Sequence, residues 1–330
     1  MQEGIRPRVY VVILNWNNYE DTKKCVESVE QATYPNLKIV VVDNASADGS
    51  GKRLEMSFPQ HRFVSNEKNL GFSRGCNSGI RAAIKDKDCA YVLLLNNDAI
   101  VPPQFLERAI EEAEKNNQIG LVGGKILTSA ETRRIWYAGG DIDRWRGQVT
   151  IRGFNEIDNG QYDEPCEVGF VTGAFMLITR EVLEKVGLLP EEYFFGIEEV
   201  DYSLNAQQAG YKLYYVPEFV SYHAGDGSHN NHDPRFVYNG YRSRLIFQEK
   251  YLPKGLFPVW KMALAVYAKW MAKRVWQRLI KKYGWDNGRD VPLDDMEFAL
   301  KKAIQDHGKS ALSEETIAYF GELLKQRKRQ

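Results

Sequence analysis

Apolar and polar positions alternate in blocks along the first hundred residues. Four short apolar runs have the length and composition of strands, and each leads into polar or Gly-rich residues. The runs are VYVVIL (9–14), LKIVVVD (37–43), HRFVSN (61–66) and AYVLLLN (90–96). Helix-like segments such as 21–32 and 74–86 separate them. This alternation predicts a parallel sheet that is covered by helices on both faces.

The pattern is less regular in the rest of the chain. Residues 102–117 predict a helix that begins at a proline and carries acids early. The later predicted elements are a strand and a helix over 168–187, a helix ended by Gly210 over 198–210, and a strand over 212–225. From about residue 251 the sequence predicts helices throughout, including two within 286–330.

Polar side chains stand where the early apolar runs end, at Asn15, Asp43, Asn66 and Asp98. In open parallel sheets, ligands bind in the crevice beyond the carboxyl ends of the strands. These side chains are therefore candidates for contact with a ligand.

The segment AYVLLLNNDAI (90–100) contains an N-x-D pair, Asn96 and Asp98, where its apolar run ends. Alternation along an extended chain places both side chains on the same side. An amide oxygen and a carboxylate so placed suit a hard cation such as Mg²⁺. The same residues also suit a turn that closes the strand by local hydrogen bonds, and both interpretations remain open.

Two polar loops are candidates for nucleotide binding. DNASADGS (43–50) could hydrogen-bond a base or ribose, or could cap a helix through Ser46 or Asp48. NEKNLGFSRGCNSGI (66–80) combines glycines with Asn69, Arg74 and Asn77, which suits a diphosphate. Its glycines could equally serve close helix packing.

The segment FFGIEEVDYSL (194–204) contains the most informative acids. An acid beside Phe194 and Phe195 could have its pKa raised toward that of a general base, which makes Glu199 a catalytic candidate. Helix N-termini favour carboxylates whatever their function, so a structural role is the alternative. His223 ends the last predicted strand, and with His229 and His232 it could serve in phosphate or metal binding.

Overall composition is that of a globular protein, with 43% apolar and 27% charged residues and zero formal net charge. The four cysteines form no CxxC pair, so we expect buried free thiols in a reducing compartment rather than a zinc site or disulfides.

The first residues do not resemble a signal peptide, and the apolar stretch 255–272 is interrupted by Lys261 and Lys269. A cytoplasmic protein is expected.

The basic charge is concentrated in the C-terminal tail, where residues 251–330 hold 16 Lys and Arg against 9 Asp and Glu. Residues 260–282 contain seven Lys or Arg, three Trp and no acid. This composition is typical of an amphipathic helix at a membrane interface. The alternative is a helix that packs on the catalytic domain or on a second subunit. Peripheral membrane contact through residues 256–282, at the inner face of the plasma membrane, and a homodimer both remain open.

Taken together, seven segments in order resemble the inverting, nucleotide-sugar-dependent family 2 glycosyltransferases of the GT-A fold. The similarity covers about residues 8–250. The segments are VVILNWNN, VVVDNASADGS, NLGFSRGCNSGI, LLLNNDAI, VTGAFMLITREVLEKVG, FFGIEEVDYSLNAQQAGY and YHAGDGSH. The N-W-N and N-x-G-F forms are most similar to bacterial rhamnosyltransferases that build cell-wall, O-antigen or capsular glycans.

The resemblance implies roles for individual residues. Asn96 and Asp98 match the ends of the D-x-D metal motif, His223 matches the later metal ligand, and Glu199 matches the catalytic base. The implied cofactor is Mg²⁺ or Mn²⁺. Two departures are that Asn96 replaces an acid and that Glu199 replaces the usual Asp.

The remaining implied roles concern the donor. Asp43 would recognise the base of a UDP or dTDP sugar, and the small residues Thr172-Gly173-Ala174 would lie under the sugar. Residues 225–236 would form a lid. The segment with Tyr238 and Arg242 would supply a cation near the diphosphate, and a surface salt bridge is the alternative for Arg242. The full set of expected nucleotide or donor contacts is Asn15, Trp16, Asp43, Asn69, Arg74, Asn77, Asn97, Gly173 and Arg242.

The expected fold is therefore α/β, a Rossmann-like GT-A sheet that is mostly parallel, with a helical C-terminal extension. Residues 1–250 would form the catalytic domain, with a nucleotide-binding half over 1–100 and a sugar and acceptor half over 101–250. Residues 251–330 would form the extension. The expected function is sugar transfer, with dTDP-rhamnose as first choice of donor, to a glycan or lipid-linked glycan acceptor and not to nucleic acid. A catalytically silent binding or scaffold protein and a sugar nucleotidyltransferase are the alternatives.

Overall fold

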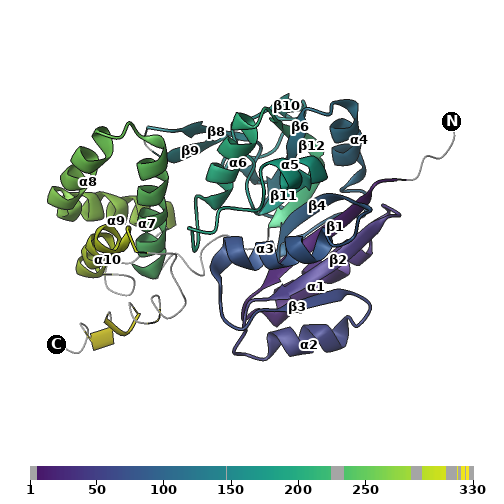
Figure 1. Cartoon of the computed structure of the whole chain (residues 1–330), viewed down its shortest axis with the longest axis horizontal. Coiled ribbons are helices and arrows are strands. Elements are labelled where there is room, and N and C mark those ends of the chain that lie inside the picture. The colour runs from purple at the N-terminus through teal and green to yellow at the C-terminus, as the bar shows by residue number, and fades with distance from the viewer. Residues whose placement is uncertain are drawn as a thin grey trace. The chain divides into compact units, whose positions relative to one another are not determined.

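The computed structural model describes residues 6–145, 147–223, 234–283 and 292–309, with positions 318, 321–323 and 325–326. The chain divides into two compact units (Figure 1). The N-terminal unit comprises Met1–Ile142, Val149–Pro190 and Glu198–Gly225, and the C-terminal unit comprises Asp143–Gln148, Glu191–Ile197 and Asp226–Gln330. Helix α7 (Pro234–Tyr251) groups with the C-terminal unit, although it precedes the expected domain boundary at residue 250.

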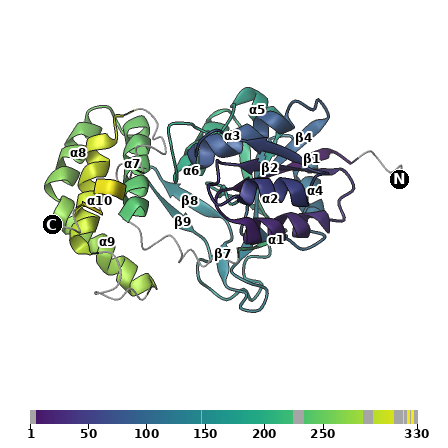
Figure 2. The same ribbon diagram turned by 90° about the horizontal axis from the view of Figure 1, so that it is seen from below.

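The first half of the N-terminal unit is a doubly wound parallel sheet, as the sequence predicts. Its strands are β1 (Arg8–Asn15), β2 (Leu37–Asp43), β3 (Arg62–Ser65) and β4 (Cys89–Asn96), in the spatial order β4-β1-β2-β3. The connecting helices are α1 (Tyr19–Glu30), α2 (Ser50–Ser57) and α3 (Gly71–Ala83). Helices α1 and α2 cover one face and α3 covers the other (Figure 2).

Burial on both faces explains why these strands have continuous apolar sequences. In β1, Val9, Val11, Val12 and Ile13 are all almost completely buried. Helix α3 approaches this sheet closely, because a Cβ at Gly75 would lie 2.7 Å from a Leu14 methyl. The sequence-based alternative that glycines of segment 66–80 serve close packing is thus correct for Gly75.

The second half of the unit extends the sheet. Strands β6 (Ile119–Leu127) and β12 (Lys212–His223) pair in parallel, and β11 (Phe175–Thr179) joins β6 to β4 by antiparallel pairing. Short strands β5 (Ala99–Ile100), β7 (Ile135–Tyr137) and β10 (Cys166–Glu167) complete ten strands among the described residues. A separate pair is formed by β8 (Gly140–Asp143) and β9 (Gln148–Ile151).

The remaining helices of this unit are α4 (Glu107–Lys115), α5 (Arg180–Lys185) and α6 (Glu198–Gln208). The expected proline-started helix begins five residues late, because residues 102–106 form turns, one of which is closed by a bond from Phe105 N–H to Pro102 O (3.2 Å). The predicted end at Gly210 is confirmed, since Gly210 has a φ of +93°.

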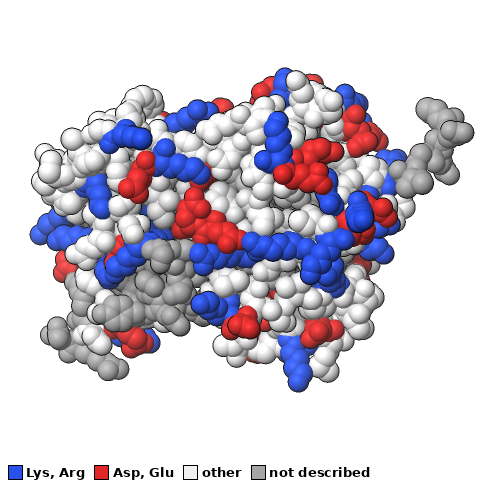
Figure 3. Space-filling view, in the orientation of Figure 1, with Lys and Arg blue, Asp and Glu red and all other residues white. Residues whose placement is uncertain are grey.

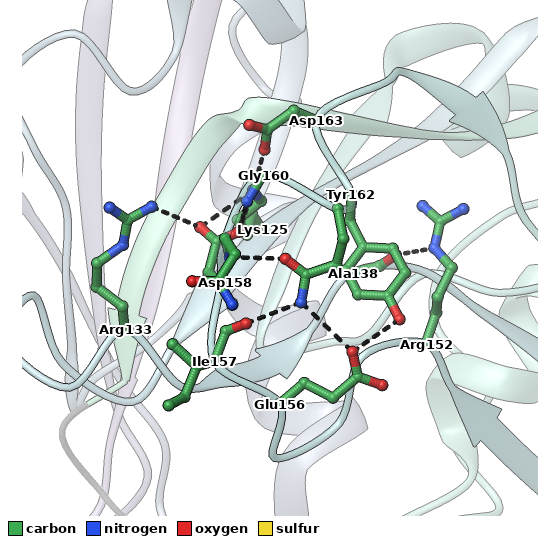
Figure 4. A network of polar contacts seen from close by, with 12 residues as sticks. Lys125, Arg133, Ala138, Arg152, Glu156, Ile157, Asp158, Gly160, Tyr162 and Asp163 are labelled. Carbon is green, nitrogen blue, oxygen red and sulfur yellow. Dashed lines mark hydrogen bonds and ion pairs between the residues drawn. The ribbon is translucent and has the colours of Figure 1, made fainter.

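A buried lysine, Lys125, belongs to a network of polar contacts in the second half of the N-terminal unit (Figure 4). Lys125 projects from β6, and its ammonium group is paired with Asp158, at 3.2 Å, and with Asp163. Arg133 also reaches Asp158, at 3.2 Å. These contacts tie the loop that contains residues 156–163 to β6, while a bridge between Arg134 and Ile157 ties the same loop to the segment that leads into β7.

The C-terminal unit consists of helices around an apolar cluster. Its described helices are α7, α8 (Leu256–Val266), α9 (Ala268–Tyr283) and α10 (Leu293–Asp306). Figure 2 shows α10 between α7 and α8. Buried side chains such as Leu245, Leu264, Ala268, Met296 and Leu300 form the cluster. Among the described residues, no helix has both the length and the hydropathy to cross a membrane.

The two acids around Lys125 differ in exposure, which allows a matched comparison. The Asp158 side chain is 5% exposed and that of Asp163 is 59% exposed. Removing one partner of a buried ion pair leaves the other charge buried without compensation. Asp158→Asn is therefore expected to lower the free energy of unfolding by about 3 kcal/mol. Asp163→Asn should cost about 1 kcal/mol or less. Urea unfolding of both variants measures the difference.

The pH dependence offers a second check on the same pair. Burial opposes ionisation of Asp158, but hydrogen bonds from Gly160 N–H and Lys125 outweigh it and hold the pKa of Asp158 below its usual value. Its stabilising contribution is thus present above the unfolded-state pKa and is lost as the pH falls through the folded-state pKa. The gap between wild type and Asp158→Asn should therefore shrink in acid. Equal losses of unfolding free energy in Asp158→Asn and Asp163→Asn would contradict the assignment of Asp158 as the buried partner of Lys125.

Candidate active site

The candidate site lies at the carboxyl ends of β1, β2 and β4. Strand pairing places Asn15 opposite Asp43 and Leu14 opposite Asn96. The strand order reverses at the β1–β4 pair, which is where ligands bind in doubly wound sheets. The polar residues that the sequence places at strand ends thus meet along one edge of the sheet.

The Asp43 carboxylate is held by a hydrogen-bond network. Its Oδ1 accepts bonds from the Asn15 amide (2.9 Å) and the Ser46 hydroxyl (2.6 Å), and its Oδ2 accepts one from Ser46 N–H (3.2 Å). The carboxylate lies against the first turn of α2, where a Cβ at Gly51 would overlap it. Asp43 is only half-buried, so part of it still faces outward. Its contact with a base stays a prediction.

Asn15 and Trp16 occupy a turn that is fastened to the 44–48 loop. Asn15 is fully buried and also receives a hydrogen bond from Thr22, at 2.9 Å. Asn17 has a φ of +53°, and its side chain accepts a bond from Ala47 N–H (2.7 Å). The turn leaves the Trp16 ring 49% exposed beside the network. Trp16 is therefore placed to offer a flat apolar surface at the sheet edge.

The predicted residues of segment 66–80 have different surroundings. Oδ1 of Asn69 accepts bonds from Asn44 (2.9 Å) and from Gly71 N–H (2.9 Å), which fixes the loop at the start of α3. Arg74 is half-buried on α3, and its contact with a diphosphate stays a prediction.

Asn77 has a structural role. It is fully buried, donates to Leu189 O (2.9 Å) and accepts from Leu189 N–H (3.0 Å). Both ends of its amide are used to join α3 to the segment after α5. We therefore do not include Asn77 in the proposed donor site.

The three predicted metal ligands come together. His223 ends β12, which pairs with β5 directly after Asp98. Nε2 of His223 lies 3.1 Å from Oδ1 of Asp98 and 3.2 Å from Nδ2 of Asn96. Asn97 points elsewhere, because its amide donates to Thr22 at 2.7 Å. The N-x-D pair is thus joined by a histidine that lies more than 120 residues later in the chain.

The chemistry of this trio fits a divalent cation. Oδ1 of Asp98 is buried and makes no hydrogen bond with the described part of the chain, although an imidazole nitrogen lies beside it. A carboxylate oxygen so placed suits a cation, which can also accept an imidazole nitrogen and an amide oxygen. Among the described residues, no cluster of three His, Cys, Asp or Glu side chains forms a metal site, so the amide of Asn96 would have to be the third ligand.

Trp136 is a residue of this site that the sequence analysis missed. Its ring stacks on the His223 imidazole, with 5.3 Å between ring centroids and 14° between planes. Trp136 lies on β7, beside the loop that the Lys125 ion pairs hold in place. Stacking restricts the rotation of His223, so Trp136 fixes the direction of the imidazole. The segment IWYAGG has an apolar run too short to mark it as part of the sheet.

Glu199 lies in the first turn of α6, beside the Thr172-Gly173-Ala174 segment. A Cβ at Gly173 would lie 3.5 Å from Cβ of Glu199 and 3.1 Å from the Phe72 ring. Ala174 O in turn accepts a bond from Asn96 N–H (3.0 Å). The small-residue segment thus contacts both the candidate base and the backbone of a candidate metal ligand.

Burial raises the pKa of the Glu199 carboxyl. The direction agrees with the expectation for a general base, although the expected cause was the neighbouring aromatic pair. Phe194 packs against the apolar cluster of the C-terminal unit, and Phe195 is exposed. Gly173 and its neighbours, within the N-terminal unit, contribute to the burial instead.

Arg242 belongs to the C-terminal unit, on α7. It is buried, and its guanidinium donates to Asp306 O (3.4 Å) and to Lys309 O (2.8 Å) near the end of α10. Tyr238, one turn earlier, donates to the Asp306 carboxylate (2.9 Å). These contacts give Arg242 a packing role, and its contact with a diphosphate stays a prediction. The alternative of a position at the surface is wrong, because the Arg242 side chain is buried. Most of the predicted lid, with His229 and His232, lies outside the described residues.

Comparisons with known proteins identify the family and the fold of the chain. The sequence model of "Glycosyl transferase family 2" matches residues 10–187, more than half of the chain. Glycosyltransferase AglE of Haloferax volcanii is 26% identical over 66% of this chain and 67% of its own length. An N-acetylglucosaminyl-diphospho-decaprenol L-rhamnosyltransferase of Mycobacterium tuberculosis is 24% identical over 63% of this chain and 73% of its own length.

Among solved structures, mannosyltransferase PcManGT from Pyrobaculum calidifontis, in complex with GDP-Man and Mn²⁺, superposes with a TM-score of 0.54 and 17% identity. That match covers 92% of this chain and 87% of the other. GalNAc-T7 with UDP, GalNAc and Mn²⁺ gives a TM-score of 0.56 over 95% of this chain and 56% of the other. The fold is therefore that of the GT-A glycosyltransferases, and the chain belongs to glycosyl transferase family 2.

Proposed function

We propose that this glycosyltransferase moves a sugar from a nucleoside diphosphate donor to a glycan or lipid-linked glycan acceptor, with inversion at the anomeric carbon. The observation that supports it best is the convergence of Asn96, Asp98 and His223, together with the contacts of Thr172-Gly173-Ala174 with both Asn96 and Glu199. Leaving-group stabilisation and base catalysis need these two kinds of group on opposite sides of a sugar.

Glu199 is the proposed catalytic base. Its carboxylate would take the proton of the acceptor hydroxyl while that oxygen attacks the anomeric carbon. The diphosphate leaves from the opposite face, so a single displacement inverts the configuration. The raised pKa of Glu199 makes the carboxylate a better proton acceptor at neutral pH than an ordinary glutamate.

The proposed cofactor is a divalent cation, Mn²⁺ or Mg²⁺, held by Asp98, His223 and the amide oxygen of Asn96. When bound, it would neutralise charge on the diphosphate leaving group. The Asn96 side chain would turn its oxygen toward the cation in place of the Nδ2 atom that now faces His223. Trp136 is the proposed positioning residue, because it keeps the imidazole in the orientation that the site requires.

The donor side of the proposal rests on the sheet edge. Asp43, Asn15 and Trp16 would hold the base, and the small residues of Thr172-Gly173-Ala174 would leave room for the sugar. Rhamnose from dTDP-rhamnose is the first choice, supported by the Mycobacterium relative whose name specifies rhamnose transfer to a lipid diphosphate. Sugars linked to UDP are the second choice of donor. Polysaccharide synthesis in the cytoplasm is the proposed setting, and the free cysteines Cys25, Cys76, Cys89 and Cys166 suit a reducing compartment.

The metal and nucleotide site predicts a specific pattern of ligand stabilisation. With Mn²⁺ present, dTDP or UDP should raise the midpoint of thermal unfolding, because each binds only the folded state. Asp98→Asn should abolish the Mn²⁺-dependent part of this rise. The control Asp88→Asn, at the amino end of β4, should leave it intact. An unchanged rise in Asp98→Asn would remove Asp98 from the site.

If Glu199 is the catalytic base, its substitution should lower activity without lowering stability. Glu199→Gln should lower the turnover number at least 100-fold, the usual contribution of a general base. Glu199→Asp, which restores the residue typical of the family, should keep measurable activity. Rates of sugar transfer with a panel of dTDP and UDP sugars test this. If Glu199→Gln transfers sugar at the wild-type rate, another group is the base.

The same variant should be more stable than wild type at neutral pH. Because the folded-state pKa of Glu199 is raised, the folded protein holds this proton more tightly than the unfolded chain. Wild-type stability therefore falls as the pH rises from the ordinary glutamate range through the folded-state pKa. Glu199→Gln escapes this loss, and thermal unfolding at pH 5 and pH 8 should show its advantage growing with pH.

The stacked tryptophan should affect metal binding more than nucleotide binding. Trp136→Ala frees the His223 ring and should weaken Mn²⁺ binding about 10-fold, the range seen when the support of a metal ligand is removed. Trp136→Phe keeps a ring against the imidazole and should recover most of the affinity. Mn²⁺ titration by calorimetry, with nucleotide affinity in the absence of metal as control, measures both. Equal losses in Ala and Phe variants would indicate a merely structural role.

A further inference from the structure

Helices α8 and α9 turn one apolar side inward, and α8, together with Trp270 at the start of α9, exposes further apolar side chains. Phe257, Leu264, Ala268 and Ala272 are buried in the apolar cluster of the C-terminal unit. On the other side, Val259 is 55%, Met262 64%, Val266 73% and Trp270 50% exposed. We name these four residues the outer stripe. Val259, Met262 and Val266 are three and four residues apart, which places them along one line of α8, and Trp270 lies in the first turn of α9.

The outer stripe is flanked by cations. Lys269, Lys273 and Arg274 are exposed on the same stretch of α9, within four positions of Trp270. The Arg274 guanidinium lies over the Trp270 ring, 3.9 Å from its centroid. Lys261 differs, because its ammonium group contacts His307 at 2.7 Å. The exposed cations thus border the stripe.

No acid interrupts this stretch of sequence. Residues 251–283 contain eight Lys or Arg and no Asp or Glu. The acids of neighbouring helices that have described ion pairs are engaged with other cations, such as Glu297 with Lys301 and Asp306 with Lys302. In Figure 3 the surface over α8, at the left, is mostly uncharged. Anionic headgroups would therefore meet the cations of α9 without carboxylates from the same stretch of sequence.

We propose that the outer stripe binds the surface of an anionic lipid bilayer. The apolar side chains would enter the boundary between headgroups and acyl chains, with the Trp270 ring at headgroup level, while Lys269, Lys273 and Arg274 contact lipid phosphates. A soluble polyanion would engage the cations but would not cover four exposed apolar side chains. The combination of apolar line and cationic border therefore identifies a lipid surface as the partner, independently of the reaction proposed above.

Vesicle cosedimentation of the full chain tests this proposal. The probes are phosphatidylcholine vesicles with and without phosphatidylglycerol. Wild type should bind the anionic vesicles, and added salt should weaken this binding. Changing Lys269, Lys273 and Arg274 together to Gln should weaken binding by about fivefold per charge removed, the value expected for a basic residue near an anionic surface.

A second variant isolates the apolar contribution. Val259, Met262, Val266 and Trp270 are changed together to Ser, and the matched control changes three exposed apolar residues of the N-terminal unit, Met56, Val149 and Ile157, to Ser. The stripe variant should lose vesicle binding and the control should keep it. All variants are first compared by circular dichroism and thermal unfolding. Asp98→Asn should bind vesicles like wild type, which separates this surface from the active site.

Three results would overturn the proposal. The first is wild type that binds neither kind of vesicle. The second is a stripe variant that binds anionic vesicles as tightly as wild type, because the attraction would then be purely electrostatic. The third is a wild-type dimer that becomes monomeric in the stripe variant without any vesicle binding, because a second copy of the chain would then be what covers the stripe.

Discussion

The pairing of β1 with β4 is the constraint on which the candidate active site depends. It sets Leu14 beside Asn96, while the pairing of β1 with β2 sets Asn15 beside Asp43. A slip of one residue would turn every side chain of a strand to the opposite face. Because β1 and β4 are packed on both faces, such a slip would also disrupt their contacts with the helices on either side. The apolar interior of the sheet thus fixes the positions of polar groups at its edge.

Buried charges at Lys125 have oppositely charged partners, whereas buried carboxylate groups at the candidate site lack comparable compensation from the described residues. Lys125 and Asp158 compensate each other, and the backbone N–H of Gly160 and the side chains of Arg133 and Asp163 add further contacts. At the candidate active site, one oxygen of Asp98 is buried without a hydrogen bond from the described residues, and burial removes hydration from the Glu199 carboxylate and raises its pKa. The first arrangement stabilises the fold. The second costs stability, which is the expected signature of groups positioned for a ligand rather than for packing.

The parallel half of the fold was predictable from sequence, because strands buried on both faces have continuous apolar runs that end sharply. The convergence of His223 on Asn96 and Asp98 followed only from the family resemblance, since no local pattern links residues so far apart. Trp136 could not be found, because stacking of rings across two short strands leaves no periodic signal. Lys125 was equally hidden, since a lysine within an apolar run gives no indication of the acids that will neutralise it.

Amides and cations were the residues whose roles were hardest to assign from sequence. Asn77 occupies a Gly-rich segment that suits a diphosphate, yet both ends of its side chain bind one backbone position 112 residues away. Arg242 satisfies backbone carbonyls of a neighbouring helix. Asparagine and arginine serve ligand binding and backbone support through the same donors, so their type and spacing do not distinguish the two uses.

The amide at position 96 has a consequence for the proposed site. With a neutral imidazole at His223, the trio of Asn96, Asp98 and His223 carries a single negative charge, whereas an acid at 96 would give it two. A divalent cation held by one charge keeps more of its own charge for the donor diphosphate. Metal alone should therefore bind weakly, and metal and diphosphate should strengthen each other's binding. In the proposed site, the departure from the usual acidic motif would thus shift part of the metal affinity from the protein to the donor substrate, so that the complete site would form when both are present.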